Sequence, residues 1–196
     1  MRRILLLGPL NSLIMCVYAQ NVDILIKPRF SISAGYIGGF ENLSDEKDKL
    51  NGFSVQGAVK TTPRIGFYTE YNKQKMSILK FNEVVTGGQY TFYDGQKVNG
   101  VIGGGIGYMW LDQNLYDPHT TITADLKLKY ITLPVFIEGE TKLSKHLSYF
   151  STLSYQWLFN YDSTVCFTLM GIETMCDSIK EDAKGLVYKL GVRYNF

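Results

Sequence analysis

The sequence predicts an all-β protein: a single antiparallel transmembrane β-barrel of about eight strands, preceded by a cleaved signal peptide. Three observations support this. Segments along most of the chain alternate apolar and polar residues, the chain begins with an export-signal pattern, and aromatic residues make up 14% of it, with 14 Tyr. Successive side chains of a strand point to opposite faces, so such strands can place one face against lipid and the other toward a lumen. The mean hydropathy of −0.04 is too low for a helical membrane protein, but it fits a barrel with a polar interior.

The last segment, residues 184–196, shows the alternation most clearly. Its apolar positions are Leu186, Tyr188, Leu190, Val192, Tyr194 and Phe196. The residues between them include Lys189, Gly191, Arg193 and Asn195. A soluble sandwich would rarely end on a buried Phe that carries the terminal carboxylate. A strand that lies against lipid and finishes with an aromatic residue at the membrane interface explains the pattern better.

The first 19 residues have the pattern of a secretory signal peptide. Arg2 and Arg3 form a positive start, residues 4–17 are mostly apolar, and Ala19 ends a suitable cleavage site. The apolar run is too short for a membrane-spanning helix, which needs about 20 residues. A lipoprotein signal is disfavoured, because Met15 stands where a small residue is required. We therefore expect a signal peptide at 1–19 and one barrel domain at 20–196.

The alternation divides the rest of the chain into strands and connections. Strands are predicted at 29–40, 53–60, 64–71, between Met76 and Tyr93, and at 97–111, 126–140, 147–160 and 184–196. Short turns are predicted at 61–63, 94–95 and 141–145, and loops at 41–51, 72–75, 112–123 and 161–183. Short turns on one side and long loops on the other are typical of outer-membrane barrels, and they place both termini in the periplasm.

Two strands carry irregularities. In the fourth, Val84, Thr86, Tyr90 and Phe92 share one face, and the pair at 87–88 predicts a glycine bulge or bend. In the sixth, the apolar side changes parity: Leu126, Leu128 and Tyr130 lie opposite Lys127 and Lys129, but the apolar set from Ile131 onward has the other parity. A one-residue bulge between positions 130 and 134 would reconcile the two halves.

Charged residues on the non-lipid faces form the main candidate site. They are Lys60, Glu70, Lys127, Lys129, Glu138, Glu140, Lys189 and Arg193. Because an eight-stranded barrel encloses little more room than its own side chains need, these charges predict a hydrogen-bonded plug. A gated pore or ion path is the alternative. Acid–base catalysis by Glu138 and Glu140 is disfavoured, because such residues in a strand more often pair with lumenal Lys or Arg.

Composition and motifs argue against several other functions. The chain has 20 Lys plus Arg and 18 Asp plus Glu, and it becomes neutral once Arg2 and Arg3 are removed, so no nucleic-acid partner is expected. The sequence contains no G-x-S-x-G elbow, no H-E-x-x-H and no P-loop. We therefore expect no enzyme activity, no cofactor and no metal.

Two cysteines lie in the last long loop. Cys166 and Cys176 would meet an oxidising compartment after export, which favours a disulfide between them. A pair of free thiols is one alternative. A metal site is another, although neither His of the sequence lies near.

Two short motifs resemble known families. The ending Tyr194-Asn195-Phe196 resembles the last strand of bacterial outer-membrane β-barrels, which implies that Tyr194 and Phe196 form a signal for the β-barrel assembly machinery. The Tyr130-to-Val135 segment, with its Y-x-x-x-P pattern, is similar to the porin-family, or PorT-like, barrels of Bacteroidetes, as is the 53–71 hairpin with Glu70. This resemblance implies an outer-membrane location among lipid and says little about activity.

Three functional hypotheses follow. The first is a structural or surface-interaction barrel, whose outer loops at 41–51, 112–123 and 161–183 contact an extracellular ligand or host surface. The second is a small passive pore for ions or small solutes, and the third is an outer-membrane lipid-modifying enzyme. A soluble ligand-binding barrel of the lipocalin type is the alternative fold.

Overall fold

A computed structural model describes residues 29–43, 46–117, 122–169, 172–178 and 180–196. The predicted signal peptide at 1–19 lies outside these residues. The strands are β1 (Arg29–Leu43), β2 (Glu46–Lys60), β3 (Ile65–Met76), β4 (Leu79–Asp94), β5 (Val98–Asp117), β6 (Ile122–Lys142), β7 (Leu147–Asn160), β8 (Thr164–Leu169), β9 (Ile172–Ser178) and β10 (Ala183–Asn195). Within the described residues, no helix is long and apolar enough to cross a membrane.

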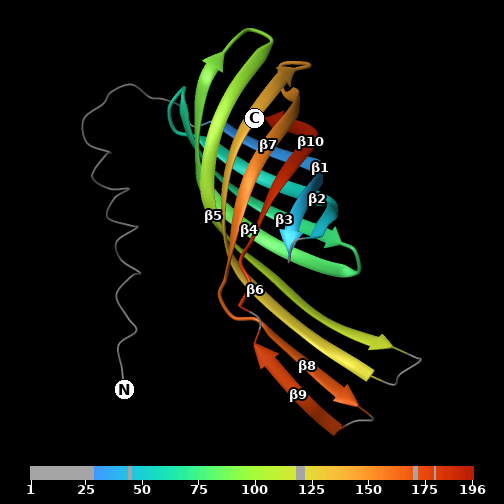
Figure 1. Cartoon of the computed structure of the whole chain (residues 1–196). Helices are drawn as coiled ribbons and strands as arrows, with labels where there is room; N and C mark the ends of the chain where they lie inside the picture. The colour runs from blue at the N-terminus through green and yellow to red at the C-terminus, as the bar shows by residue number, and fades with distance from the viewer. Residues whose placement is uncertain (1–28, 44–45, 118–121, 170–171, 179) are drawn as a thin grey trace, which may run out of the picture.

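Eight of these strands form a closed antiparallel barrel (Figure 1). Each strand from β1 to β7 pairs with the next, and β10 pairs with both β7 and β1, which closes the ring. The predicted all-β barrel of eight strands is thus confirmed. The hairpin of β8 and β9 stands outside the ring and continues the sheet along the start of β6.

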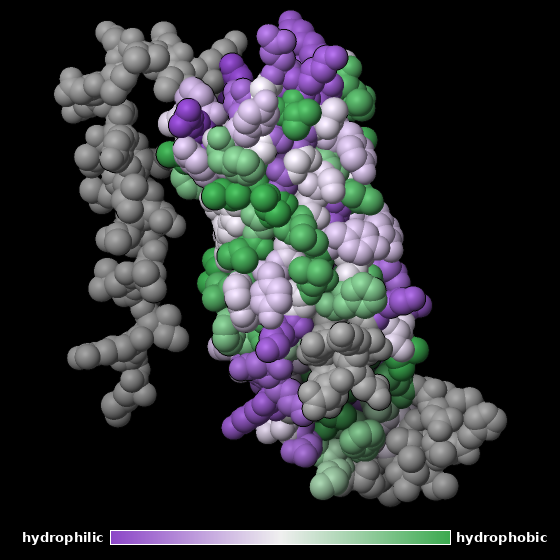
Figure 2. Space-filling view, turned by 45° about the horizontal axis from the view of Figure 1, so that its top comes forward, coloured by the Kyte–Doolittle hydropathy of each residue, from purple (hydrophilic) through white to green (hydrophobic). Residues whose placement is uncertain are grey.

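The alternating pattern explains why these segments form the barrel wall. Along β7, for example, Leu153 is 49% exposed on the outside, whereas the neighbouring Thr152 and Ser154 are buried inside. Figure 2 shows hydrophobic side chains across the middle of the barrel wall, with hydrophilic ones above and below them. A wall of this kind is stable only where apolar material surrounds it, which is the condition inside a bilayer.

Several strands are longer than the sequence predicts. Most of the predicted loop at 41–51 is paired strand, because β1 reaches Leu43 and β2 begins at Glu46. Most of the predicted loop at 112–123 is paired as well, since β5 reaches Asp117. The predicted loop at 72–75 is part of β3. Backbone hydrogen bonds hold a β-ladder together in water as well as in lipid, so these strands continue where the apolar pattern that identified them has ended.

The predicted loop at 161–183 contains regular structure too. Its central part forms the β8–β9 hairpin, and β8 pairs with β6 from Ile122↔Leu169 to Lys127↔Thr164. Figure 1 shows this hairpin and the long ends of β5 and β6 projecting from one end of the barrel, while the C-terminus lies toward the other. We call these the hairpin end and the turn end. The predicted turns at 61–63, 94–95 and 141–145 coincide with short connections at the turn end.

Both predicted bulges are wrong. β6 keeps one register with β5 and with β7 throughout, so Leu128 and Tyr130 point inward and Lys127 and Lys129 point outward. The apolar residues change from the outer to the inner face of β6 because the lumen itself becomes apolar there. No inserted residue, and so no bulge, is needed to explain the change. In β4 the predicted outward face is confirmed, but the register shift against β5 lies between Thr91 and Tyr93, not at 87–88.

Candidate functional site in the barrel lumen

The lumen has three levels, and Arg193 is the centre of the middle one. Arg193 is 4% exposed, and its guanidinium donates two hydrogen bonds to Glu138, from Nη1 to Oε1 at 2.6 Å and from Nη2 to Oε2 at 3.1 Å. It also donates to Glu140 Oε2 at 3.4 Å and to Gln56 Oε1 at 3.1 Å. Its carbon Cζ lies 5.1 Å from the centre of the Phe150 ring. A bidentate Arg–carboxylate pair of this kind fixes both side chains in place.

Neutral side chains complete the shell around the two carboxylates. Thr152 donates to Glu138 Oε2 at 3.1 Å, and Asn99 donates to Glu140 Oε2 at 3.4 Å. Asn195 donates to Glu140 Oε1 at 3.5 Å. Each buried charge therefore has polar partners from several strands, as burial in a confined space requires.

A second ion pair lies beside the first. Lys189 of β10 donates to Glu70 Oε1 of β3, across the lumen. Gln56 joins the two pairs, because its Nε2 donates to Glu70 Oε2 at 3.3 Å while its Oε1 accepts from Arg193. The middle of the lumen is therefore one connected polar network.

Glu83 is a buried carboxylate that the sequence analysis did not single out. It is 1% exposed and accepts four hydrogen bonds: Thr132 and Gln156 donate to Oε1 at 2.7 and 2.8 Å, and Asn72 and Gln74 donate to Oε2 at 2.9 and 3.1 Å. In the predicted fourth strand, Glu83 lies on the face opposite to that of Val84. The alternation of the sequence therefore already indicates that Glu83 faces the lumen.

The network leaves very little free space in the middle level. A cavity of about 20 Å³ remains there, and Glu70, Asn72, Glu83 and Lys189 contribute to its wall. This volume is about that of a single water-sized molecule. At the turn end, by contrast, the lumen opens into a vestibule of about 960 Å³.

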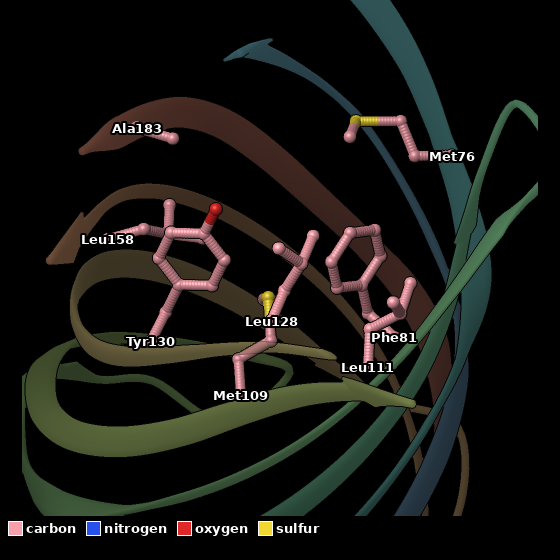
Figure 3. Close-up of a cluster of buried hydrophobic side chains, with 8 residues drawn as sticks. All are labelled: Met76, Phe81, Met109, Leu111, Leu128, Tyr130, Leu158 and Ala183. Atoms are coloured by element: carbon pink, nitrogen blue, oxygen red, sulfur yellow. The ribbon is translucent and has the colours of Figure 1, made fainter. Parts of the chain in front are cut away.

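An apolar cluster closes the lumen at the hairpin end (Figure 3). It consists of Met76, Phe81, Met109, Leu111, Leu128, Tyr130, Leu158 and Ala183. These side chains come from six different strands and point toward one another inside the ring. The cluster is a small dry core of the kind found in soluble proteins, and it separates the polar network from the outside of the hairpin end.

The structure brings together five of the eight predicted lumen charges: Glu70, Glu138, Glu140, Lys189 and Arg193. Lys60 also faces inward but lies at the wall of the vestibule. The prediction is wrong for Lys127 and Lys129, which face outward because the lumen beside them is apolar. Lys129, which lies beyond the apolar band, pairs with Asp162 at 2.8 Å, and this hydrogen bond raises the pKa of the Lys129 ammonium.

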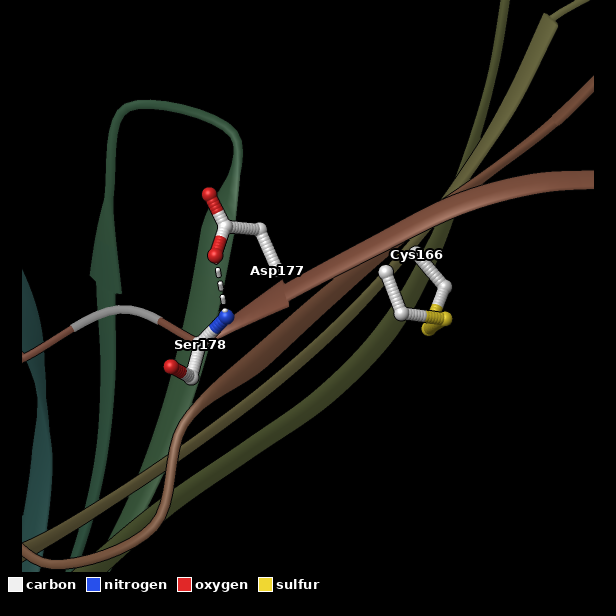
Figure 4. Close-up of a disulfide and its surroundings, with 4 residues drawn as sticks. Cys166, Asp177 and Ser178 are labelled. Atoms are coloured by element: carbon white, nitrogen blue, oxygen red, sulfur yellow. Dashed lines mark hydrogen bonds between the residues drawn. A yellow bond between two sulfur atoms is a disulfide. The ribbon is translucent and has the colours of Figure 1, made fainter.

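The predicted disulfide joins β8 to β9 (Figure 4). Cys166 and Cys176 are directly opposite in the hairpin register, with their Cα atoms 4.1 Å apart. Near the end of β9, the backbone N–H of Ser178 donates to Asp177 Oδ1 at 2.8 Å. The covalent bond restricts the hairpin to one register.

Solved outer-membrane proteins share this fold. A major outer membrane protein of Thermus thermophilus matches with a TM-score of 0.66 and 14% identity, over 86% of this chain and 99% of that one. Neisserial surface protein A matches with a TM-score of 0.64 and 14% identity, over 85% and 97%. OprG of Pseudomonas aeruginosa matches with a TM-score of 0.57 and 13% identity, over 86% and 95%.

No protein-family model and no curated protein sequence matches the chain. The structural matches confirm the predicted fold, a β-barrel of the kind seen in these outer-membrane proteins.

Proposed function

We propose that this chain is an outer-membrane barrel with a structural or surface-interaction role, in which the hairpin end faces the cell exterior and contacts an extracellular ligand or host surface. The observation that carries this proposal is the contrast between the two ends. The lumen is closed by its own side chains, whereas the longest strands and the disulfide-linked hairpin extend away from the band that faces lipid.

The hairpin end offers a contact surface of suitable character. Phe167 and Met175 on the hairpin and Tyr161 before it are exposed apolar residues. Such residues are favourable anchors for a protein partner when a rigid scaffold holds them. The disulfide supplies this rigidity, so partner binding would cost little ordering of the hairpin.

Removal of the hairpin tests the proposal. Replacing residues 164–178 by a short Gly-Ser linker should leave the barrel folded, seen as unchanged heat-modifiable mobility on gels. Adhesion of cells that display the protein to cultured epithelial monolayers should be lost. Lys145→Gln at the turn end is a control that should retain adhesion. Unchanged adhesion without the hairpin would overturn the proposed role.

Assembly and export form part of the same proposal. We propose that residues 1–19 direct export and that Tyr194 and Phe196 are recognised by the assembly machinery, with bilayer lipid as the final partner. The outward positions of Tyr194 and Phe196 on the barrel wall support this assignment. Phe196→Ala should slow membrane insertion while secretion into the periplasm continues, and normal insertion would contradict the assembly signal.

We also propose that the chain is related to the porin-like barrels of Bacteroidetes. The segment around Pro134 supports this relationship.

A passive pore is the second candidate, because the vestibule at the turn end would give solutes access to the lumen from that side. Planar-bilayer recordings separate the two functions: a closed lumen gives no discrete openings, whereas regular openings would favour the pore. The hypothesis of a lipid-modifying enzyme is tested by incubating the refolded barrel with phospholipid or lipid A and measuring product.

A further inference from the structure

The vestibule at the turn end has more cations on its wall than carboxylates that can pair with them. The charged side chains that border it are Arg29, Lys60, Asp94, Glu140, Lys142 and Lys145. Asp94 pairs with Lys142, whose Nζ lies 3.4 Å from Oδ1. Glu140 accepts a hydrogen bond from Arg193 of the lumen network. Both carboxylates of the wall are therefore engaged, and Arg29, Lys60 and Lys145 remain.

These three cations have no ion-pair partner among the described residues. No carboxylate oxygen lies within 4.0 Å of a side-chain nitrogen of Arg29, Lys60 or Lys145. The terminal carboxylate of Phe196, a residue at the same wall, forms no such pair with them either. The remaining carboxylates of the described lumen lie in its middle level, where other side chains already bond to them: Glu70, Glu83 and Glu138.

Two of the three cations lie side by side. Arg29 and Lys60 are directly opposite in the register of β1 and β2, and both border the vestibule. Residues in this position have Cβ atoms about 5 Å apart, and like charges there repel each other. An anion held between the two side chains would remove this repulsion.

We propose that Arg29 and Lys60 bind a phosphate group, either inorganic phosphate or the phosphate of a small organic ester. A phosphate monoester carries a charge of about −1.5 to −2 at neutral pH, so it matches two cations, whereas a single carboxylate would neutralise only one. The planar Arg guanidinium can donate two parallel hydrogen bonds to phosphate, and Lys adds a compact positive charge. Lys145, in the turn before β7, adds a third positive charge to the same vestibule.

The vestibule has room for more than the phosphate alone. Its volume of about 960 Å³ is in the range of pockets that hold small organic ligands. Ser31, Thr62 and Gln96 border the same space and offer hydrogen-bonding groups to a polar molecule that carries the phosphate. The inference goes beyond the proposed function, because it concerns the end of the barrel opposite to the hairpin.

Isothermal titration calorimetry of the full barrel tests the site. Inorganic phosphate and glycerol 3-phosphate are titrated separately, in non-ionic detergent and a Hepes buffer of constant ionic strength. At least one of them should bind in a saturable way to a single site. Tighter binding of glycerol 3-phosphate would assign the site to an ester, and equal or weaker binding to inorganic phosphate. Lys60→Gln should weaken the affinity about tenfold or more, the loss expected for one hydrogen bond to a charged group.

A second variant and a matched control keep the experiment decisive. Arg29→Gln should weaken phosphate binding as Lys60→Gln does, and it decides the question should Lys60→Gln fail to fold. Arg29→Lys keeps the charge but loses the planar fork, so its affinity should be intermediate. The control Lys127→Gln removes an exposed lysine at the hairpin end and should bind phosphate as the unmodified protein does.

Three results would overturn the proposal. The first is the absence of saturable binding of either probe to the unmodified protein. The second is binding that persists at full affinity in both Lys60→Gln and Arg29→Gln. The third is an equal loss of affinity in Lys127→Gln, which would assign the effect to the overall charge of the barrel instead of to the vestibule.

Discussion

The band of the barrel that faces lipid and the extension at its hairpin end have the same backbone but the opposite arrangement of side chains. In the band, Leu153 points outward and Glu138 is buried in the lumen. In the extension, Met109 and Leu128 are buried inside while Lys127 is exposed outside. A single strand, β6, passes from one arrangement to the other without a change of register. The medium around a strand, and not the strand itself, decides which face is apolar.

The two regions are therefore stabilised by different forces. The band depends on lipid contact outside and on paired charges inside, where each charge needs its partner. The extension depends on a dry core that is removed from water, as in a soluble protein. Substitutions chosen from each region should separate these contributions.

Arg193→Met should have the largest effect. It leaves Glu138 and Glu140 buried without their cation, which costs on the order of 3–5 kcal/mol of unfolding free energy. Urea unfolding in phospholipid vesicles measures the loss. Arg193→Lys keeps the charge but loses the bidentate geometry, so it should be intermediate. A loss below about 1 kcal/mol in Arg193→Met would show that the network does not stabilise the band.

Leu158→Ala and Leu153→Ala compare the two regions within one strand. Leu158 is 2% exposed in the apolar cluster, so its truncation should leave a cavity and cost about 2–5 kcal/mol. Leu153 is 49% exposed toward lipid, and acyl chains can fill the space that its truncation opens. It should therefore lose only the transfer contribution, about 0.8 kcal/mol per methylene group. Equal losses, measured by the same urea titration, would contradict the different packing of the two faces.

A lysine introduced on each outer surface sharpens the comparison. Leu153→Lys places a charge against lipid and should cost about 2–4 kcal/mol near the middle of the bilayer. Met175→Lys, on the 66% exposed side chain of β9, should leave the unfolding free energy almost unchanged because water surrounds it. If both variants lost the same amount, the apolar band would not mark the bilayer.

The sequence was sufficient for strands that lie within the band. β7 and β10 were predicted with nearly their observed bounds because lipid on one side and a polar lumen on the other impose a strict alternation on them. The alternation no longer predicts the faces of a strand where lipid outside and a polar lumen inside no longer flank it. For this reason the sequence predicts that Lys127 faces the lumen and Leu128 faces outward, whereas the structure shows the reverse.

The site was predictable as a list of residues but not as a set of contacts. The inward parity of Glu70 and Lys189 follows from the sequence, whereas their pairing across 119 residues depends on how the barrel closes. Glu83 was missed because its strand carries the polar Lys80 and Asn82 on the face that elsewhere is apolar, which weakens the alternation there.

The smallest effect is expected at the outer ion pair between Lys129 and Asp162. The pair is exposed and screened by salt, so Lys129→Gln should change the unfolding free energy only slightly at neutral pH. Because the pair raises the pKa of Lys129 above its ordinary 10.5, the stabilisation is fully present below that value and is lost as the pH rises through the folded-state pKa. Unfolding followed from pH 7 to 11 should therefore show the unmodified protein and Lys129→Gln converging in the alkaline range, with Asp162→Asn behaving like Lys129→Gln. A difference that grew with pH would mean that Lys129 is stabilised in its neutral form, as it would be if it pointed into the lumen.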